Sequence, residues 1–253
     1  MEPYIALQGV SFSYHRPDGE IEALSDISFT VSKGEFVSLV GPSGCGKSTI
    51  LSILAGLLHT ENGSKHINTD VSFGYMFQQD LLLPYYTIYK NISLGPSIHG
   101  TLDPSTEKRL DALLYQYGLS QFRNKYPGQL SGGMRQRAAL IRTLALNPDT
   151  LLLDEPFSAL DYQTRLLVAD DIGRIIRKEH KTAILVTHDL SEAISLSDKI
   201  IVLSKRPAKV IKIMNIDIPG KEKGSLAVRE RPEFGEYFQI LWKEMNPPDE
   251  RTA

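Results

Sequence analysis

The sequence feature that most constrains the fold is a glycine-rich segment, GPSGCGKS at residues 41–48, with an apolar run on each side. Before it, residues 36–40 read FVSLV, which predicts a strand buried on both faces. After it, apolar residues recur at helical spacing, at positions 50, 51, 54, 57 and 58. A strand, a glycine-rich turn and a helix in this order predict a loop whose backbone N–H groups surround phosphate oxygens.

The loop fits the pattern G-x-x-x-x-G-K-[ST], in which single positions have separate predicted roles. Lys47 is expected to bridge the β- and γ-phosphates of a nucleotide, and Ser48 to ligate Mg²⁺ through its hydroxyl. The neighbourhood of Cys45 would favour a thiolate, but we interpret this residue as a small spacer that offers its N–H. The predicted nucleotide-binding residues of the loop are Gly41, Pro42, Ser43, Gly44, Cys45, Gly46, Lys47, Ser48 and Thr49.

The rest of the chain predicts strands that alternate with helices. Alternating apolar residues predict a half-buried strand at 27–31, and apolar runs predict buried strands at 150–153, 183–187 and 200–203. Helices are predicted at residues 50–58, 108–117, 132–146, 162–179, 190–196 and 234–245, and an edge hairpin at 209–218. This alternation predicts an α/β fold with a largely parallel sheet and helices on both faces. Residues 80–140 differ from the rest, because their regular segments are helical.

Three side chains that could bind a metal or take part in catalysis follow predicted strands. Asp154, at the end of a buried strand beside a phosphate loop, can hold Mg²⁺ directly or through water. Glu155 can orient or deprotonate an attacking water. His188 lies at the ligand-binding edge of a parallel sheet, where it can contact the γ-phosphate or serve as a hydrogen-bonded structural histidine. The other five histidines share no spacing that indicates a metal, and we interpret them as surface or loop residues.

A second candidate anion site precedes the predicted helix at residues 132–146. Ser131 is a good N-cap residue, and Gly132 and Gly133 leave the first-turn N–H groups open to a ligand. A simple N-cap explains the same residues, and the sequence alone does not choose between the two interpretations.

Composition excludes several classes of protein. The 253 residues suffice for one large domain with an inserted subdomain. A formal net charge of −2 disfavours nucleic-acid binding by bulk electrostatics. A single cysteine excludes an internal disulfide and a zinc site of several thiolates. No stretch approaches the roughly 18 to 20 apolar residues of a membrane-spanning helix, and the first ten residues lack a signal-peptide pattern, so we expect a protein kept inside the cell.

Together these segments resemble the nucleotide-binding subunit of an ABC transporter, from about residue 10 to residue 203. GPSGCGKST resembles its Walker A motif, LSGGM followed by RQRAAL its signature, LLLDEP its Walker B motif, FSALD its D-loop and VTHD its switch histidine. Within the family, FSALDYQTR, DLSEAISLSDKIIVLSKRP and RPEF at 231–234 look most like the importers of nitrate, sulfonate and taurine.

The resemblance implies a P-loop NTPase (RecA-like) fold with a mostly parallel sheet, an N-terminal antiparallel β-subdomain and an inserted helical subdomain. Residues 1–253 would form one ABC ATPase domain. Residues of about 1–79 and 141–205 would form the ATP-binding core, 80–140 the helical subdomain with the signature, and 206–253 a C-terminal hairpin and helix. One departure from the family is visible, because only 31 positions separate Lys47 from Gln78 and residues 61–72 are shorter than its usual strand-rich hairpin.

The resemblance also implies roles for further residues. Tyr14 resembles the aromatic residue that stacks on adenine, although an ordinary strand tyrosine is the alternative. Gln78 resembles the glutamine that reaches the metal and the attacking water, and Gln79, the next residue, is a close rival for the same role. Asp161 resembles the D-loop aspartate. The implied catalytic residues are Glu155, His188 and Gln78, the metal ligands are Ser48, Gln78 and Asp154, and the further nucleotide contacts are Tyr14, Ser131, Gly132, Gly133 and Asp161.

The implied function is an ATPase, with ATP and Mg²⁺, that powers import of a small organic or inorganic anion. Two copies would pair head to tail, with Ser131 and Gly133 of one chain covering ATP on Lys47 of the other. The implied partners are transmembrane permease subunits and, indirectly, a substrate-binding protein, but no nucleic acid. The implied location is peripheral, on the cytoplasmic side of the cell membrane. The transported molecule is not encoded in this chain.

The rival interpretation is a soluble ABC ATPase in protein or cofactor assembly, for example of the iron–sulfur type. DNA-repair relatives carry long coiled coils, whereas Lys47 and Ser131 are only 84 positions apart with no heptad run between them. Translation-factor relatives hold two ATPase domains, for which 253 residues are too few. A P-loop kinase would leave LSGGM and His188 unexplained.

Overall fold

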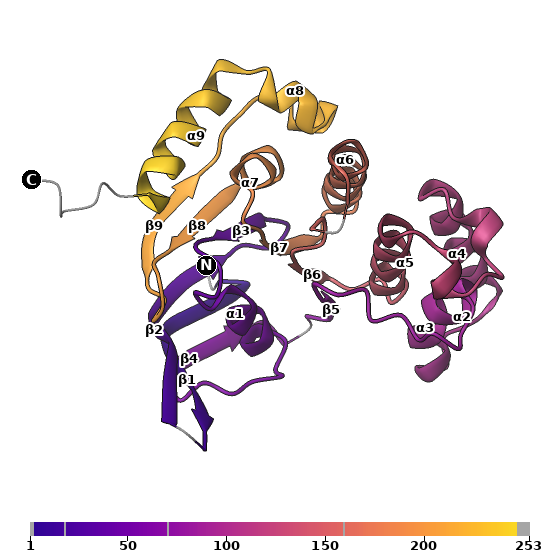
Figure 1. The fold of residues 1–253 in the computed structure, drawn as a ribbon, viewed down its shortest axis with the longest axis horizontal. Helices are drawn as coiled ribbons and strands as arrows, with labels where there is room; N and C mark the ends of the chain where they lie inside the picture. The colour runs from indigo at the N-terminus through magenta and orange to yellow at the C-terminus, as the bar shows by residue number, and fades with distance from the viewer. Residues whose placement is uncertain (1–2, 18, 70, 159, 247–253) are drawn as a thin grey trace, which may run out of the picture.

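The computed structural model describes residues 3–17, 19–69, 71–158 and 160–246, and Figure 1 shows its two sheets and their helices. The strands are β1 (Ile5–Arg16), β2 (Gly19–Val31), β3 (Phe36–Val40), β4 (Asn62–Ile67), β5 (Phe73–Met76), β6 (Thr150–Asp154), β7 (Thr182–Val186), β8 (Lys199–Leu203) and β9 (Val210–Asn215). The α-helices are α1 (Lys47–Leu54), α2 (Ile88–Ile92), α3 (Leu94–Ile98), α4 (Pro104–Gln116), α5 (Gly132–Leu144), α6 (Tyr162–Lys178), α7 (Leu190–Leu196), α8 (Ser225–Arg229) and α9 (Pro232–Met245). Short 3-10 turns lie at Ser120–Phe122, Pro127–Gln129 and Lys221–Lys223.

The larger sheet has six strands in the order β5-β6-β7-β3-β8-β9. Its neighbouring strands run parallel except for β9, which pairs antiparallel with β8. The predicted parallel sheet is thus confirmed. Because β3 lies between β7 and β8, the glycine-rich loop that follows β3 emerges among the carboxyl ends of the neighbouring strands, where ligands bind in open α/β sheets.

The smaller sheet is antiparallel, with the order β2-β1-β4. In the last part of β2, Ile27, Phe29 and Val31 are buried while Ser28 and Thr30 are exposed, as their alternation predicts. The shortened segment at residues 61–72 contributes one strand, β4, to the edge of this sheet. The N-terminal antiparallel sheet expected from the family resemblance is therefore present.

The residues of the central strands alternate between two apolar cores. On one face, Leu151, Leu153 and Leu185 pack in a cluster with residues of α4, α5 and α6. On the other face, Leu152 and Ile184 pack with α1 and with the inner side of the antiparallel sheet. Burial on both faces explains why β3, β6 and β7 have continuous apolar sequences.

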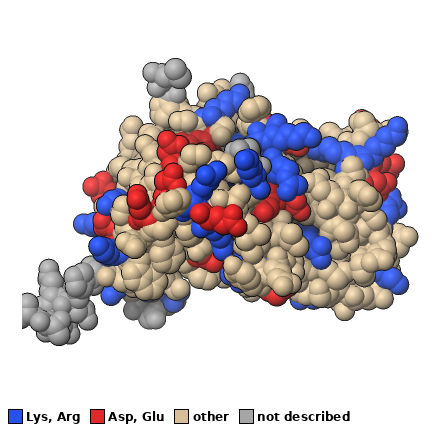
Figure 2. Space-filling model, turned by 90° about the horizontal axis from the view of Figure 1, so that it is seen from above, with Lys and Arg blue, Asp and Glu red and all other residues tan. Residues whose placement is uncertain are grey.

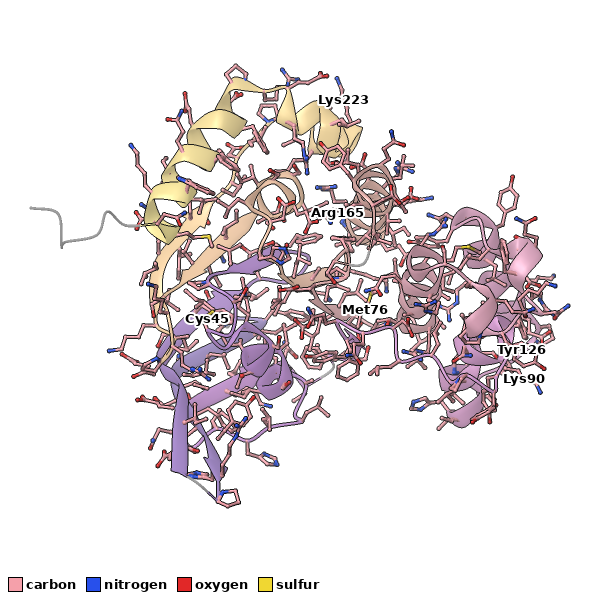
Figure 3. The ribbon with its side chains drawn as sticks, viewed as in Figure 1. Cys45, Met76, Lys90, Tyr126, Arg165 and Lys223 are labelled. Carbon is pink, nitrogen blue, oxygen red and sulfur yellow. The ribbon has the colours of Figure 1, made fainter. Side chains whose placement is uncertain are left out.

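Helices α2 to α5 form a separate group beyond the β5 edge of the large sheet (Figure 1). Within this group, α5 packs against α2 and α4, and it also contacts β5. Figure 3 shows Met76, the last residue of β5, where the sheet meets these helices, while Lys90 and Tyr126 lie at the outer end of the group. The predicted helical character of residues 80–140 is confirmed.

Two predicted elements differ from the structure. Helix α1 ends at Leu54 rather than residue 58, because Gly56 takes the left-handed conformation common after a helix, with φ +76°. Leu57 is consequently exposed. Residues 209–218 supply one strand, β9, instead of a hairpin of their own, and the hairpin is formed by β8 with β9.

The C-terminal helices α8 and α9 cover α7 and β8 (Figure 1). In the described part of the chain, no helix combines the length and apolar character that crossing a membrane requires. On the face seen in Figure 2, acidic and basic side chains are interspersed, in keeping with the small formal net charge.

Candidate active site

The phosphate-binding loop joins β3 to α1 and depends on glycines at two strained positions. Gly44 has φ +72° and Gly46 has φ +123°, conformations that side chains disfavour. A Cβ on Gly46 would also lie 2.7 Å from Leu24 Cδ2 of β2. Lys47 is buried and its Nζ donates to the backbone oxygens of Gly41, at 2.8 Å, and of Pro42, at 3.0 Å. An ammonium group has three donors, so one remains for a phosphate oxygen.

A cavity of about 460 Å³ lies over this loop. Its volume falls in the range of roughly 300 to 1,000 Å³ that is common for small-molecule sites. The lining residues are Tyr14, Ala23, Ser43, Gly44, Gly46, Lys47, Ser48, Thr49, Gln78, Glu155, His188 and Arg206. Ten of these twelve were predicted from the sequence; Ala23 and Arg206 were not. Segments far apart in the chain thus converge on one cavity.

Asp154, the last residue of β6, is held beside the loop by Ser48. The Ser48 Oγ donates to Asp154 Oδ1 at 2.9 Å. Burial raises the pKa of Asp154, and the Ser48 hydrogen bond partly opposes this effect. A hydroxyl and a carboxylate are hard oxygen donors of the kind that Mg²⁺ takes, so the residues present fit this metal.

Tyr75 of β5 was missed in the sequence, where no motif distinguishes it. Its hydroxyl is a further hydrogen-bond partner of Asp154. Burial raises the pKa of Tyr75 to about 12, so the phenol stays protonated at neutral pH.

Glu155 lies between two of the predicted catalytic side chains. The Gln78 Nε2 donates to Glu155 Oε2 at 3.1 Å, and the His188 Nδ1 lies 3.3 Å from Glu155 Oε1. The three residues follow β5, β6 and β7, so the parallel sheet brings together side chains that are far apart in sequence. Both glutamines are exposed, but Gln78 lines the cavity and its neighbour Gln79 is not among the lining residues. The geometry therefore favours Gln78 of the two glutamines.

Tyr14 reaches the cavity from β1. Its hydroxyl shares a hydrogen bond of 3.0 Å with Thr49 Oγ1, and the edge contact of its ring with Phe12 has a centroid distance of 5.0 Å. The side chain is 38% exposed, so part of the ring remains available to a planar ligand.

Three predicted loop residues do not line the cavity. Gly41 and Pro42 offer their carbonyls to Lys47, and the N–H of Cys45 donates to Pro42 O at 3.3 Å. Cys45 is buried, and Figure 3 labels it near α1 and the sheets. Burial raises the pKa of its thiol more than Lys47 lowers it. The raised pKa disfavours a thiolate at this position, in keeping with the interpretation of Cys45 as a small spacer.

The predicted second anion site lies apart from the cavity. The Ser131 Oγ accepts from the Met134 N–H at 3.4 Å, and Asp161 Oδ1 accepts from the Thr164 N–H at 3.1 Å, so both are helix N-caps. Neither residue lines the cavity of its own chain, nor do Gly132 and Gly133. A Cβ on Gly133 would lie 3.0 Å from Leu160 Cδ2, which places the signature beside the D-loop. Ala159 of the D-loop lies outside the described residues.

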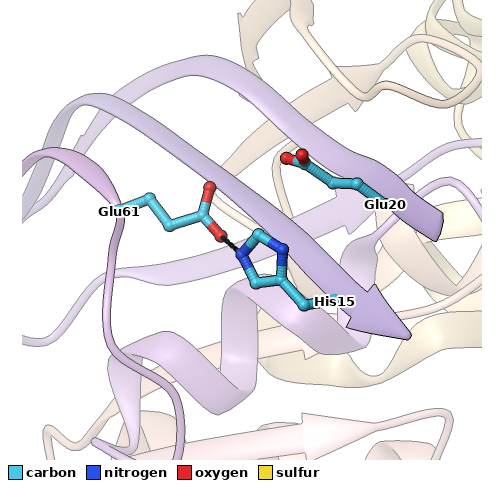
Figure 4. Close-up of side chains that lie close together, drawn as sticks. All are labelled: His15, Glu20 and Glu61. Carbon is cyan, nitrogen blue, oxygen red and sulfur yellow. Dashed lines mark hydrogen bonds and ion pairs between the residues drawn. The ribbon is translucent and has the colours of Figure 1, made fainter. Parts of the chain in front are cut away.

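One histidine has acidic neighbours that its sequence spacing did not indicate. His15 is paired with Glu20 across β1 and β2, and its Nε2 lies 3.1 Å from Glu61 Oε1 (Figure 4). Candidate ligand atoms of all three residues lie within 4.8 Å of one another, and all three residues are exposed. Glu61 is 46 residues away in sequence, so only the pairing of β4 with β1 brings it close.

Comparisons with known proteins agree with this site. A model of the family described as ABC transporter matches residues 24–158. The chain is 43% identical to the uncharacterized ABC transporter ATP-binding protein YtlC of Bacillus subtilis (strain 168), over 96% of each chain. It is 36% identical to the taurine import ATP-binding protein TauB of Roseobacter denitrificans, over 94% of each chain. It is 40% identical to the aliphatic sulfonates import ATP-binding protein SsuB of Bacillus licheniformis, over 78% of each.

Solved structures of ABC transporter cassettes are also similar to this chain. The dimeric structure of MJ0796, a bacterial ABC transporter cassette, matches with a TM-score of 0.76 and 32% identity, over 84% of this chain and 99% of that one. A post-hydrolysis state of the same cassette, bound to ADP and Pi, matches with a TM-score of 0.75 and 30% identity, over the same shares of the two chains. The family match spans more than half of the chain, and YtlC and TauB align over more than nine-tenths of it, so the chain belongs to the ABC transporter family, as one of its ATP-hydrolysing, ATP-binding subunits.

Proposed function

We propose that this chain is the ATPase of an importer for a small anion of the nitrate, sulfonate or taurine type. The observation that carries the ATPase is the Glu155 carboxylate held between Gln78 and His188 at the edge of the phosphate cavity. Support for the transported class comes from relatives named for taurine and aliphatic sulfonate import, which align over most of the chain.

The residues of the site divide the chemical work. Ser48, Asp154 and Gln78 would hold Mg²⁺, which when bound neutralises charge on the transferred phosphate. Glu155 accepts a proton from the attacking water, and Gln78 orients that water. His188 contacts the γ-phosphate, Lys47 bridges the β- and γ-phosphates, and Tyr14 stacks on adenine. The loop N–H groups and the N-terminus of α1 attract the phosphates.

The proposed domain organisation follows the described elements. Residues 1–253 work as one ABC ATPase domain. Residues of about 1–79 and 141–205 carry the ATP-binding core, 80–140 the helical subdomain with the signature, and 206–253 the C-terminal strand β9 and helices.

The proposed partners are a second copy of the chain and membrane subunits. In the head-to-tail pair, Ser131, Gly132, Gly133 and Asp161 of one copy reach the nucleotide held by the other. The pair would dock on permease subunits at the cytoplasmic side of the membrane, and a substrate-binding protein would act through the permease.

The first experiment tests the phosphate loop. Lys47→Ala removes the ammonium group that the loop carbonyls of Gly41 and Pro42 hold, so nearly all ATPase activity should be lost while the circular dichroism spectrum is unchanged. Equal ATPase rates for variant and parent would contradict the assignment.

A second experiment separates the importer from the assembly-factor interpretation. The chain is expressed with and without a candidate permease from the same organism, and its distribution is measured after membranes are sedimented. The importer subunit is recovered with membranes only when the permease is present. Identical distributions in both samples would favour the assembly factor.

A further inference from the structure

Arg206 is the cation in the cavity to which no motif assigns a role. It lies in the connection between β8 and β9, is exposed, and lines the cavity together with Lys47 and Glu155. Within the described residues, its guanidinium makes no hydrogen bond or ion pair with another side chain or with the backbone. A charged group that faces a cavity without an internal partner is available to a ligand.

The connection that carries Arg206 is held by hydrogen bonds at both ends. Ser204 N donates to Lys209 O at 2.9 Å, and Lys209 N donates to Ser204 Oγ at 2.9 Å. Ala208 N donates to Ala23 O at 2.9 Å, and Ser25 N donates back to Ala208 O at 2.9 Å. Ala208, two residues after Arg206, is thereby fixed beside Ala23, a second lining residue. A side chain on a fixed connection loses less entropy on binding than one on a free loop.

The order of the strands places Arg206 opposite the hydrolytic side chains. Gln78, Glu155 and His188 follow β5, β6 and β7, which lie on one side of β3 in the sheet. Arg206 follows β8, which lies on the other side of β3. The phosphate loop, which follows β3, therefore has the proposed catalytic residues Gln78, Glu155 and His188 on one side and Arg206 on the other.

We propose that Arg206 binds the phosphates that a nucleotide keeps after hydrolysis, so that it holds ADP and ATP alike. The inference rests on the proposed function, because it deepens the role of the same cavity. Two of the three donors of Lys47 are already bonded to loop carbonyls, so its ammonium group has one N–H left for the phosphates, and Arg206 supplies further N–H donors at the same cavity. The planar guanidinium suits this task, since its paired N–H groups match two oxygens of one phosphate.

Calorimetric titration of Arg206→Ala with ADP, and with ATP in a Glu155→Gln background, tests the proposal. We expect both dissociation constants to rise by the same factor, about threefold to tenfold for an exposed charge-assisted contact. In the Glu155-containing protein, the KM for ATP should rise by a larger factor than kcat falls. Raising the salt from about 0.05 M to about 0.5 M should shrink the difference between variant and parent, because an exposed charge is screened.

Two matched variants complete the design. Arg206→Lys keeps the charge and should recover part of the affinity for both nucleotides. Lys205→Ala removes the neighbouring exposed cation, which does not line the cavity, and should bind like the parent. Thermal melting of all variants checks that the fold is kept.

Three outcomes overturn the proposal. Parent affinity of Arg206→Ala for ADP would exclude a contact with the retained phosphates. A loss confined to ATP would place the guanidinium at the γ-phosphate. An equal loss of nucleotide affinity in Lys205→Ala would show that the effect comes from general surface charge and not from a contact of Arg206. Failure of the proposed function is distinguishable from all three, because the parent itself would then bind neither nucleotide and Lys47→Ala would change nothing.

Discussion

At the residue scale, burial sets the chemistry of Cys45 in the phosphate loop. The thiol is 2% exposed, and burial raises its pKa despite the nearby Lys47. A raised pKa means less thiolate at any given pH, and the thiolate is the reactive form. We expect Cys45 of the folded protein to react with iodoacetamide far more slowly than Cys45 of the urea-unfolded protein, as measured by mass spectrometry over time. Equal rates in both states would show that the side chain is accessible and ionised.

Glu192 is a second buried group, and it makes stability depend on pH. Thr187 Oγ1 donates to its Oε2 at 2.7 Å, and the charged or titratable groups that face it are Asp189, Arg165 and His188. Burial is the largest effect and raises the pKa of Glu192, so the folded state favours the protonated acid. The stability that the protonated Glu192 contributes to the folded state is therefore fully present below the unfolded pKa of about 4.3 and is lost as the pH rises through the folded pKa.

Glu192→Gln should remove that loss, since the amide stays neutral and its oxygen can still accept from Thr187. The free energy of unfolding of the variant minus that of the parent should increase from about pH 4 to about pH 7, as measured by urea titration at each pH. Glu236→Gln, at an exposed position on α9, serves as the matched control. A difference for Glu192→Gln that stays constant across this range would contradict the role of burial.

At the element scale, the turn between β3 and α1 makes different demands on its two strained glycines. An added Cβ at Gly44 meets nothing within 4 Å, whereas at Gly46 it lies 2.7 Å from Leu24 Cδ2 and 3.1 Å from Ala23 O. We expect Gly44→Ala to lower the free energy of unfolding by about 1 kcal/mol, from backbone strain alone. Gly46→Ala should lower it by about 2 to 4 kcal/mol, because overpacking against β2 is added. Urea titration of the two nucleotide-free variants measures the difference, and equal losses would show that contact with β2 is unimportant.

The elements that could be predicted from the sequence are those in which the pattern of apolar residues matches the burial of the side chains. The strands β3, β6 and β7 are buried on both faces, so their apolar runs were sufficient. Strand β4 could not be predicted in this way, because its sequence, NGSKHI, is almost wholly exposed and the strand exists through its pairing with β1. The helix was predicted to extend too far because Leu57, an exposed residue beyond the end of α1, happens to lie at helical spacing from the buried leucines.

The same distinction holds in the candidate site. Gln78, Glu155 and His188 follow strands of one parallel sheet, so the motifs that contain them also place them together. Arg206 and Ala23 join the cavity only because the β8–β9 connection is hydrogen-bonded to β2, a contact between residues about 180 positions apart that no local pattern encodes.

At the scale of the whole molecule, the phosphate loop and the signature lie apart within one chain. The cavity over the loop is lined by neither Ser131 nor Gly133, and the N-terminus of α5 packs instead near Leu160. Two copies related head to tail would bring the signature of each chain to the nucleotide of the other. A nucleotide held in this way contacts both chains, so it should join them for as long as it is not hydrolysed.

A variant that binds ATP without hydrolysing it should therefore accumulate as a dimer. Glu155→Gln keeps the shape of the side chain but removes the proton acceptor, a loss that typically costs about 10² to 10⁴ in rate. With Mg²⁺ and ATP present, we expect this variant to elute as a dimer in size-exclusion chromatography, and as a monomer without nucleotide. Hydrolysis at the parent rate would remove Glu155 from the catalytic role.

Adding Ser131→Arg to this variant tests whether the signature is the second half of the site. The longer side chain would fill the space at the N-terminus of α5, where the Ser131 Oγ accepts from the Met134 N–H. Because Ser131 does not line the cavity of its own chain, the double variant should bind ATP with the affinity of Glu155→Gln yet elute as a monomer. Lys90→Ala, at an exposed position at the outer end of the same helical group (Figure 3), is the control and should leave the dimer intact. A double variant that still dimerises with ATP would show that the two copies meet through another surface, and one that no longer binds ATP would place Ser131 at the nucleotide of its own chain.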